Sequence, residues 1–456
     1  MRRAAIVLLV ASVIAGAESP DALTPLQRAV YNDDLAKVKS LLAAEQDARA
    51  ANRYGVTALS LASTNGNEAI VNLLLEAGAD PNGSLRGGET PLMTAARTGK
   101  VGPIRALLAR GAAVNAANAY GQTAIMWAAA EGHAEVLDVL IRAGADFRAR
   151  LPSGFTPMLF AVREGHKNVV QTLLTAGVGI NERVTPGGRP RKGFLRPGST
   201  ALDLAVENGH FELAAFLLEN GADPKGGDTG FTPLHAISWV RKTSRGDDHD
   251  PVPQGVGNMT SIEFVRKLVA HGADVNAPIT RHVRGLSRLN TLGATPFFAA
   301  SRTADVELMQ VLVELGANPL TPNADLSTPL MAAAGLGCVS PGEDPGTPEE
   351  TLAAVELALK LGGDVNAVDK NGDAAMHGAA YKNLPNVVEF LAANGAKIEI
   401  WHRKNKQGWT PLTIAEGRRF GNFKPSPETV AAFHKVMLAA GVKPVSDVAA
   451  KSAQVY

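Results

Sequence analysis

The amino-acid sequence predicts an all-α repeat solenoid, because one short pattern recurs along most of the chain. A threonine that precedes Pro-Leu or a similar pair recurs every 33 residues at Thr24, Thr57, Thr90, Thr123 and Thr156. The series continues at less regular spacing through Thr200, Thr232, Thr295, Thr328 and Thr410, with Ala374 in the same role. We therefore expect about eleven helix-turn-helix units over residues 18–442.

Each unit is predicted to hold two short helices. The threonine can cap the first helix, and a proline at the first helical position loses no hydrogen bond. An Ala-rich stretch such as residues 124–130 forms the first helix, and Gly132 supplies the turn after it. Residues 136–141 are mostly apolar and form the second helix, which ends near Gly144. No unit can bury its apolar face alone, so the units must stack.

These motifs resemble the ankyrin-repeat family. The resemblance is carried by segments such as GFTPLHA at residues 230–236 and HGADVN at residues 271–276, and it extends over residues 22–442. It implies finger loops, a concave face and a role in binding other proteins. It also implies that His235 and His377 are structural, each hydrogen-bonded to the backbone of a neighbouring loop. It does not identify the partner, because this fold serves many unrelated ones.

The first 17 residues have the pattern of a secretory signal peptide. Arg2 and Arg3 precede the apolar residues 4–14, and the small residues 15–17 suit a cleavage site after Ala17. The apolar run is too short to span a bilayer comfortably, so no stable membrane span is expected after cleavage; an uncleaved anchor is the alternative. The sequence therefore predicts a periplasmic or secreted protein.

The charge balance and cysteine content of the chain limit the class of partner that we expect. The chain has 45 Lys+Arg against 44 Asp+Glu, which argues against a generally basic nucleic-acid binder. Its single cysteine, Cys338, fits an exported bacterial protein better than a disulfide-rich eukaryotic one. We expect a monomer with an unknown, acidic, periplasmic or envelope-associated protein partner, and a disordered tail at residues 443–456.

Four insertions interrupt the period. Two lie on the finger side of a unit, near residues 182–199 and 277–293, and two lie between the helices of a unit, near residues 241–258 and 335–348. Both finger insertions and the finger at residues 397–408 carry excess positive charge. Gathered along one edge, these cations would suit an anionic surface, although solvated loops that only aid solubility are the alternative. The candidate partner-binding residues are Arg189, Arg191, Lys192, Arg196, Arg281, Arg284, Arg288, Trp401, Arg403 and Lys404.

Catalytic chemistry is not expected. The sequence holds no recognisable nucleophile elbow, phosphate-binding loop or metalloprotease motif, and no catalytic or metal-ligating residue or cofactor is predicted. The acidic run at residues 247–250 lacks metal-loop spacing, Cys338 would need an activating base, and Trp127 is expected in the core. The leading hypothesis is an exported, non-enzymatic protein–protein interaction scaffold that binds through its concave face and basic fingers. Alternatives are a pocket formed by the insertions, with phosphate- or carboxylate-bearing ligands or weak enzymatic activity, and a passive spacer.

Overall fold

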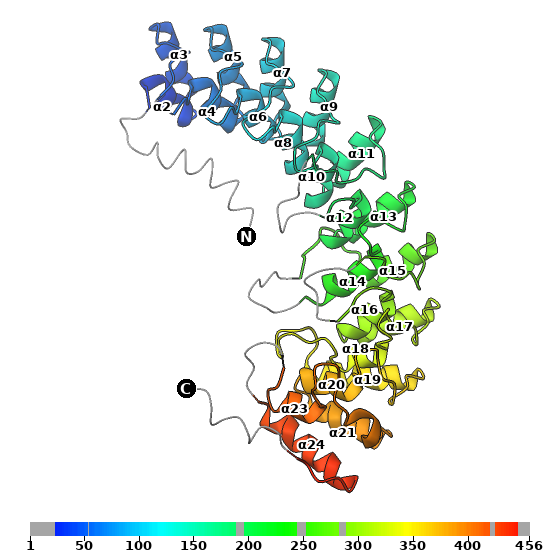
Figure 1. Cartoon of the computed structure of the whole chain (residues 1–456). Coiled ribbons are helices and arrows are strands. Elements are labelled where there is room, and N and C mark those ends of the chain that lie inside the picture. The colour runs from blue at the N-terminus through cyan, green and yellow to red at the C-terminus, as the bar shows by residue number, and fades with distance from the viewer. Residues whose placement is uncertain are drawn as a thin grey trace, which may run out of the picture. The chain divides into compact units, whose positions relative to one another are not determined.

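The computed structural model describes residues 23–52, 54–187, 196–243, 252–281, 289–419 and 425–445. Every regular secondary-structure element in this part of the chain is an α-helix (Figure 1). The predicted all-α repeat solenoid is therefore confirmed. The chain divides into two compact units, Met1–Pro197 and Gly198–Tyr456. The signal-peptide prediction and residues 446–456 of the predicted tail lie outside the described residues.

Unit 1 has two layers of short helices. The inner helices are α2 (Pro25–Tyr31), α4 (Ala58–Asn65), α6 (Pro91–Ala96), α8 (Ala124–Glu131) and α10 (Pro157–Glu164). The outer helices are α3 (Leu35–Ala43), α5 (Glu68–Glu76), α7 (Val101–Ala109), α9 (Ala134–Arg142) and α11 (Lys167–Thr175). Each inner helix packs on its own outer helix and on an adjacent inner helix of unit 1, as stacking of repeats requires.

Unit 2 repeats this arrangement. Its inner helices are α12 (Ala201–Glu207), α14 (Pro233–Arg241), α16 (Pro296–Arg302), α18 (Pro329–Ala333), α20 (Ala375–Tyr381) and α23 (Pro411–Ala415). Its outer helices are α13 (Phe211–Glu219), α15 (Ser261–Ala270), α17 (Val306–Glu314), α19 (Pro348–Lys360), α21 (Pro385–Ala393) and α24 (Pro427–Ala439). One further turn, α22 (Ile398–Trp401), lies in the finger before α23.

Caps set the helix boundaries as the sequence predicts. The Thr90 hydroxyl accepts a hydrogen bond from Met93 N at 3.3 Å, and the Thr295 hydroxyl accepts one from Phe298 N at 3.3 Å. Gly132 ends α8 with φ +84°, a left-handed conformation that residues with a Cβ rarely adopt. The threonine and proline positions therefore fix where most inner helices begin, and a left-handed glycine ends α4, α8 and α10.

The core lies between the inner and outer layers of each unit. In unit 1, Trp127 on α8 is 8% exposed, which confirms its expected place in the core. In unit 2, the largest fully buried side chains are Phe264, Phe297, Phe298 and Phe433. None of the helices in the described residues is long and apolar enough to cross a membrane.

Several connections between the helices of unit 2 are long. Residues 242–260 join α14 to α15, and residues 334–347 join α18 to α19, so both lie between the helices of one repeat. Residues 271–295 form the enlarged finger between α15 and α16. A further between-helix loop, residues 416–426, joins α23 to α24. Unit 2 therefore carries three enlarged loops at the carboxyl ends of its inner helices.

Candidate functional site

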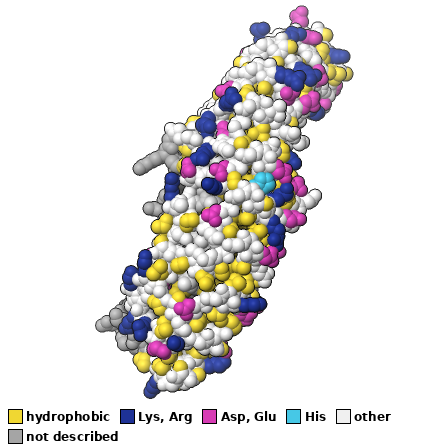
Figure 2. Space-filling view, turned by 90° about the vertical axis from the view of Figure 1, so that its right-hand side faces the viewer, with side chains coloured by type: hydrophobic (Ala, Val, Ile, Leu, Met, Phe, Trp, Pro, Cys, Tyr) yellow, Lys and Arg dark blue, Asp and Glu magenta, His cyan; other side chains and the backbone are white. Residues whose placement is uncertain are grey.

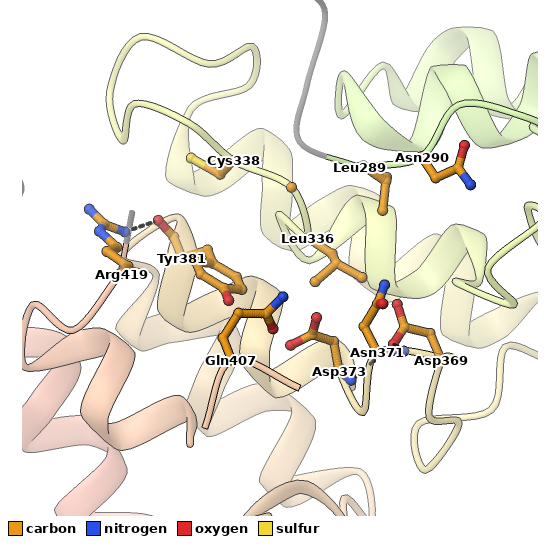
Figure 3. A pocket seen from close by; sticks show the side chains of 11 residues that line it. Leu289, Asn290, Leu336, Cys338, Asp369, Asn371, Asp373, Tyr381, Gln407 and Arg419 are labelled. Atoms are coloured by element: carbon orange, nitrogen blue, oxygen red, sulfur yellow. Dashed lines mark hydrogen bonds between the residues drawn. The ribbon is translucent and has the colours of Figure 1, made fainter. Parts of the chain in front are cut away.

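A cavity of about 140 Å³ in unit 2 is the candidate site (Figure 3). Fingers supply one part of its lining, and the turns at the ends of inner helices supply the other. The finger residues are Leu289, Asn290, Asp369, Asn371, Asp373 and Gln407. The remaining lining residues are Leu336, Gly337, Cys338, Tyr381 and Arg419. The cavity thus lies between two kinds of loop that the repeats bring together.

The finger before α20 is shaped by Asp369. One carboxylate oxygen accepts hydrogen bonds from Asn371 N at 2.8 Å and Asp373 N at 3.0 Å, and the other accepts one from the Ser327 hydroxyl at 2.8 Å. An aspartate or asparagine that binds its own backbone in this way stabilises a tight turn. Both oxygens of Asp369 are therefore already used to build the finger.

The side chain of Asp373, in contrast, points into the cavity. Its Oδ1 accepts a hydrogen bond from Asn405 Nδ2 at 2.8 Å, and it lies 3.9 Å from His377 Nε2. Its side chain is 10% exposed and points towards the middle of the cavity (Figure 3). The pKa of Asp373 is raised to about 6, mainly by burial and also by the nearby Asp369 carboxylate, against the lowering effect of the Asn405 hydrogen bond. This carboxylate can therefore change its charge near neutral pH.

The loop at residues 334–347 is held by two charged side chains. Asp344 accepts hydrogen bonds from Val339 N at 2.7 Å and Ser340 N at 3.1 Å. Lys382 Nζ donates to the carbonyl of Pro345 and to the Thr351 hydroxyl. Burial lowers the pKa of Lys382, yet these partners keep the ammonium group satisfied. The loop is thereby fixed against the end of α20.

Cys338 lies on this loop and faces the cavity. Burial raises the pKa of its thiol, and the nearby Asp344 carboxylate raises it further. A nucleophilic cysteine needs the opposite shift, because the thiolate is the reactive form. The environment of Cys338 therefore favours an inert thiol.

An ion pair anchors the insertion that follows α14. Arg241 Nε lies 2.6 Å from Asp305 Oδ2, and Arg241 Nη2 lies 3.1 Å from Asp305 Oδ1. The same guanidinium contacts the more exposed Glu307 at 2.7 Å. Asp305 also caps α17 by accepting a hydrogen bond from Leu308 N at 3.2 Å. One buried carboxylate thus joins the end of α14 to the start of α17.

The predicted partner-binding residues fall into three groups. Arg189, Arg191, Lys192, Arg284 and Arg288 lie outside the described residues, as does the acidic run at 247–250. Arg196 is half-buried and has interactions of its own, whereas Arg281 is exposed and donates to the Asp228 carbonyl at 2.9 Å. Arg403 and Lys404 are exposed on the finger at 397–408.

Trp401 requires a correction. The sequence analysis placed it at the partner surface, but its side chain is 3% exposed. The turn α22 directs the indole inward, where it packs 5.7 Å from the ring of Phe433 and donates to the Ala396 carbonyl. Trp401 therefore belongs to the core, and we remove it from the proposed site.

Exposed cations gather beside the cavity at the tips of two adjacent fingers. We call Lys370, Arg403, Lys404 and Lys406 the fingertip cluster. The two fingers are joined by a hydrogen bond from Lys406 N to the Asn371 carbonyl at 2.8 Å. Within the described part of the chain, no ion pair joins any member of this cluster to a carboxylate. Lys370 Nζ donates instead to the Ala324 carbonyl at 2.7 Å.

The outer helices of unit 2 show the opposite arrangement. Ion pairs join Lys267 to Glu219 and Arg266 to Glu314, each at 2.6 Å. A third joins Lys435 to Glu389 at 2.6 Å. Figure 2 likewise shows a face on which cationic and anionic side chains are interspersed rather than separated by sign. Selective attraction of an anion is thus better supported at the fingertip cluster than on the outer helices.

Comparisons with known proteins agree with this architecture. A model of ankyrin repeats in three copies matches residues 3–84 and 82–151, and a single ankyrin-repeat model matches residues 153–183 and 197–226. The chain is 27% identical over 243 residues to the E3 ubiquitin-protein ligase KEG of Arabidopsis thaliana, over 46% of this chain but only 14% of that protein. The crystal structure of the human ASB11 ankyrin repeat domain is 23% identical, with a TM-score of 0.45, over 57% of this chain and 98% of that one.

Proposed function

Because the chain belongs to the ankyrin-repeat family, we propose that it is an exported, non-enzymatic scaffold that binds an acidic protein partner through the fingers and concave face of unit 2. Ankyrin repeats are protein-interaction modules, so a protein partner follows from the family. The acidic character of that partner is supported by the fingertip cluster, whose four exposed cations form no ion pair with a carboxylate among the described residues. Unpaired surface charge steers an oppositely charged partner into contact.

Reversing the charge of the fingertip cluster tests this proposal. Changing Lys370, Arg403, Lys404 and Lys406 to glutamate should weaken partner binding about tenfold or more at low salt, because attraction becomes repulsion. The full chain, tagged at its carboxyl end, would be purified from its own host at low ionic strength, and the co-purifying partner would then be titrated against both versions. Added salt should weaken the wild-type complex by screening.

A matched control makes the same charge change on outer helices. Lys37, Lys39, Arg105 and Lys360 are exposed there, and their replacement by glutamate should leave partner affinity unchanged. Equal weakening by both variants, or none by either, would contradict a role for the fingertip cluster.

Export is tested separately. Cell fractionation followed by intact-mass measurement should find a chain that begins at Glu18 outside the cytoplasm. A chain that keeps residues 1–17, or one confined to the cytoplasm, would contradict the proposed export without affecting the partner-binding proposal.

A further inference from the structure

The cavity in unit 2 combines an apolar wall with an acidic floor. Leu289 and Leu336 are 5% and 4% exposed and form the apolar part. The amides of Asn290, Asn371 and Gln407 and the carboxylate of Asp373 form the polar part. Figure 3 shows Leu336 directly above Asp373, with Leu289 beyond it. A ligand with an alkyl chain and one polar end would match both surfaces.

A carboxylate oxygen that accepts no hydrogen bond indicates the chemistry of the ligand's polar end. Asp373 uses Oδ1 to bind Asn405, whereas Oδ2 accepts no hydrogen bond from the described residues. The side chain is nine-tenths buried and aimed into the cavity. A carboxylate oxygen that faces a cavity and has no protein donor can accept a hydrogen bond from a ligand. The structure thus leaves room for a donor, most favourably a cationic one.

The groups around Asp373 favour a cation. Asp369 contributes a second negative charge from the same finger, and the Tyr381 hydroxyl lies within 3.3 Å of Asn405 Nδ2. His377 is neutral at pH 7, because burial lowers its pKa to about 4. Arg419 is an opposing charge, but it lies at the other end of the cavity beyond Tyr381, with its guanidinium donating to the Tyr381 carbonyl (Figure 3). The four cations of the fingertip cluster also oppose a cation, but their side chains are exposed and lie outside the cavity lining.

The volume restricts the ligand to a small group. At about 140 Å³, the cavity is comparable with protein cavities of ~150 Å³ that hold one benzene molecule. A chain of about four carbons with a terminal ammonium fits this size. The branched, planar guanidinium of arginine on its longer stem would fit less well.

We propose that this cavity binds a primary alkylammonium group, with the ammonium on Asp373 and the alkyl chain against Leu289 and Leu336. The group can come from a lysine side chain of a bound protein or from a free alkyl amine. If the group is a lysine of a bound protein, the site rests on the proposed partner-binding function and anchors that protein. In the second case it is independent of that function.

Binding of n-butylamine to the full chain tests the site. Saturation-transfer NMR should detect butylamine but not n-butanol, which has the same chain without the charge. Asp373→Asn should weaken butylamine binding about tenfold or more, because the ammonium loses its counter-charge. The substitution is isosteric, so the hydrogen bond from Asn405 can remain. Asp325→Asn, on the neighbouring finger and outside the cavity lining, is the control and should bind as wild type does.

Two further measurements guard against misfolding and give a pH signature. Leu336→Phe should block butylamine by filling the cavity without changing charge. With wild type, affinity should fall up to tenfold per pH unit as the pH drops below about 6, because butylamine must then compete with a proton on Asp373. Equal binding of butylamine and n-butanol, or equal binding by wild type and Asp373→Asn, would overturn the proposal.

The source of the amine is resolved by a capped Gly-Lys-Gly peptide and its norleucine analogue. Binding of the lysine peptide alone supports a partner's lysine, and binding of butylamine without either peptide supports a free amine. Absence of binding by all of these probes overturns the site. The fingertip variant should still bind butylamine, so failure of the partner proposal remains distinguishable from failure of this one.

Discussion

When His235 is replaced with glutamine, unit 2 should lose about 3 kcal/mol less stability than wild type between pH 6.5 and pH 4. The buried His235 ring accepts a hydrogen bond from Thr232 N at 3.1 Å through Nδ1, and its Nε2 contacts the Ala294 carbonyl at 3.1 Å. A proton on Nδ1 would face another N–H group. Burial lowers the pKa of His235 to about 4, so the unfolded chain takes up a proton below pH 6.5 while the folded chain does not. Stability therefore falls as the pH decreases through this window.

The chain itself shows why glutamine is the right replacement. Gln27 occupies the same position in the first repeat, where its Oε1 accepts from Thr24 N at 3.0 Å and its Nε2 donates to the Val56 carbonyl at 2.9 Å. His235→Gln can thus keep both contacts without a titrating group. Stability near pH 7.5 should change by about 1 kcal/mol or less.

Hydrogen exchange of the α14 peptides in the full chain, at several pH values, measures this effect locally. Wild type and variant must be compared at the same pH, because Asp373 acts in the opposite direction. Its pKa is raised to about 6, so it adds stability as the pH falls from 6 towards 4. His271→Gln, at an exposed histidine, is the control. An unchanged pH dependence in His235→Gln would show that this ring is protonated in the folded protein.

Replacing Asp305 with alanine should lower the free energy of unfolding around α14 and α17 by about 3–5 kcal/mol. Asp305 is 2% exposed, and its removal leaves Arg241 without the partner that holds it in two places. The substitution also removes the cap of α17, worth about 1 kcal/mol. Repeat arrays need not unfold in one step, so local hydrogen exchange is more informative than a single melting temperature.

Glu307 provides a comparison with the same cation. Its side chain is 65% exposed, so Glu307→Gln should cost about 1 kcal/mol or less even though the Arg241 contact is equally short. Asp305→Asn separates the two roles of the aspartate, because asparagine can still cap α17 but carries no charge. Similar losses for Asp305→Ala and Glu307→Gln would contradict the importance of burial in this pair.

Much of the fold could be predicted because its determinants are local. Threonine, proline and glycine act on the backbone within one helical turn, so their positions reveal helix ends directly. The hydrogen bond from His235 to a neighbouring loop confirms the structural role that the repeat pattern implied. Insertions between elements shift the period, so their places could also be predicted. The signal peptide, export and the acidic partner stay predictions.

The candidate site could not be predicted, because it is formed by contacts that the sequence does not display. Asp369 and Asp373 look like ordinary turn residues, and only stacking brings them opposite Leu336 and Cys338. Trp401 follows Lys397 in a charged finger and was expected at the surface, yet the turn α22 packs it on Phe433, 32 residues later in the chain. Contacts between repeats determine both outcomes, and no local pattern encodes them.

The enlarged loops after α14, α18 and α23 have a consequence for how such a protein can change. Closing a loop of twice the length costs only about 0.6 kcal/mol, and each repeat packs mainly on its neighbours. Insertions at this turn can therefore accumulate during evolution while the helices and their caps stay under separate selection. In a library built on this scaffold, the same turn is where new sequence can be introduced with the smallest penalty to folding, so specificity can diverge faster than architecture.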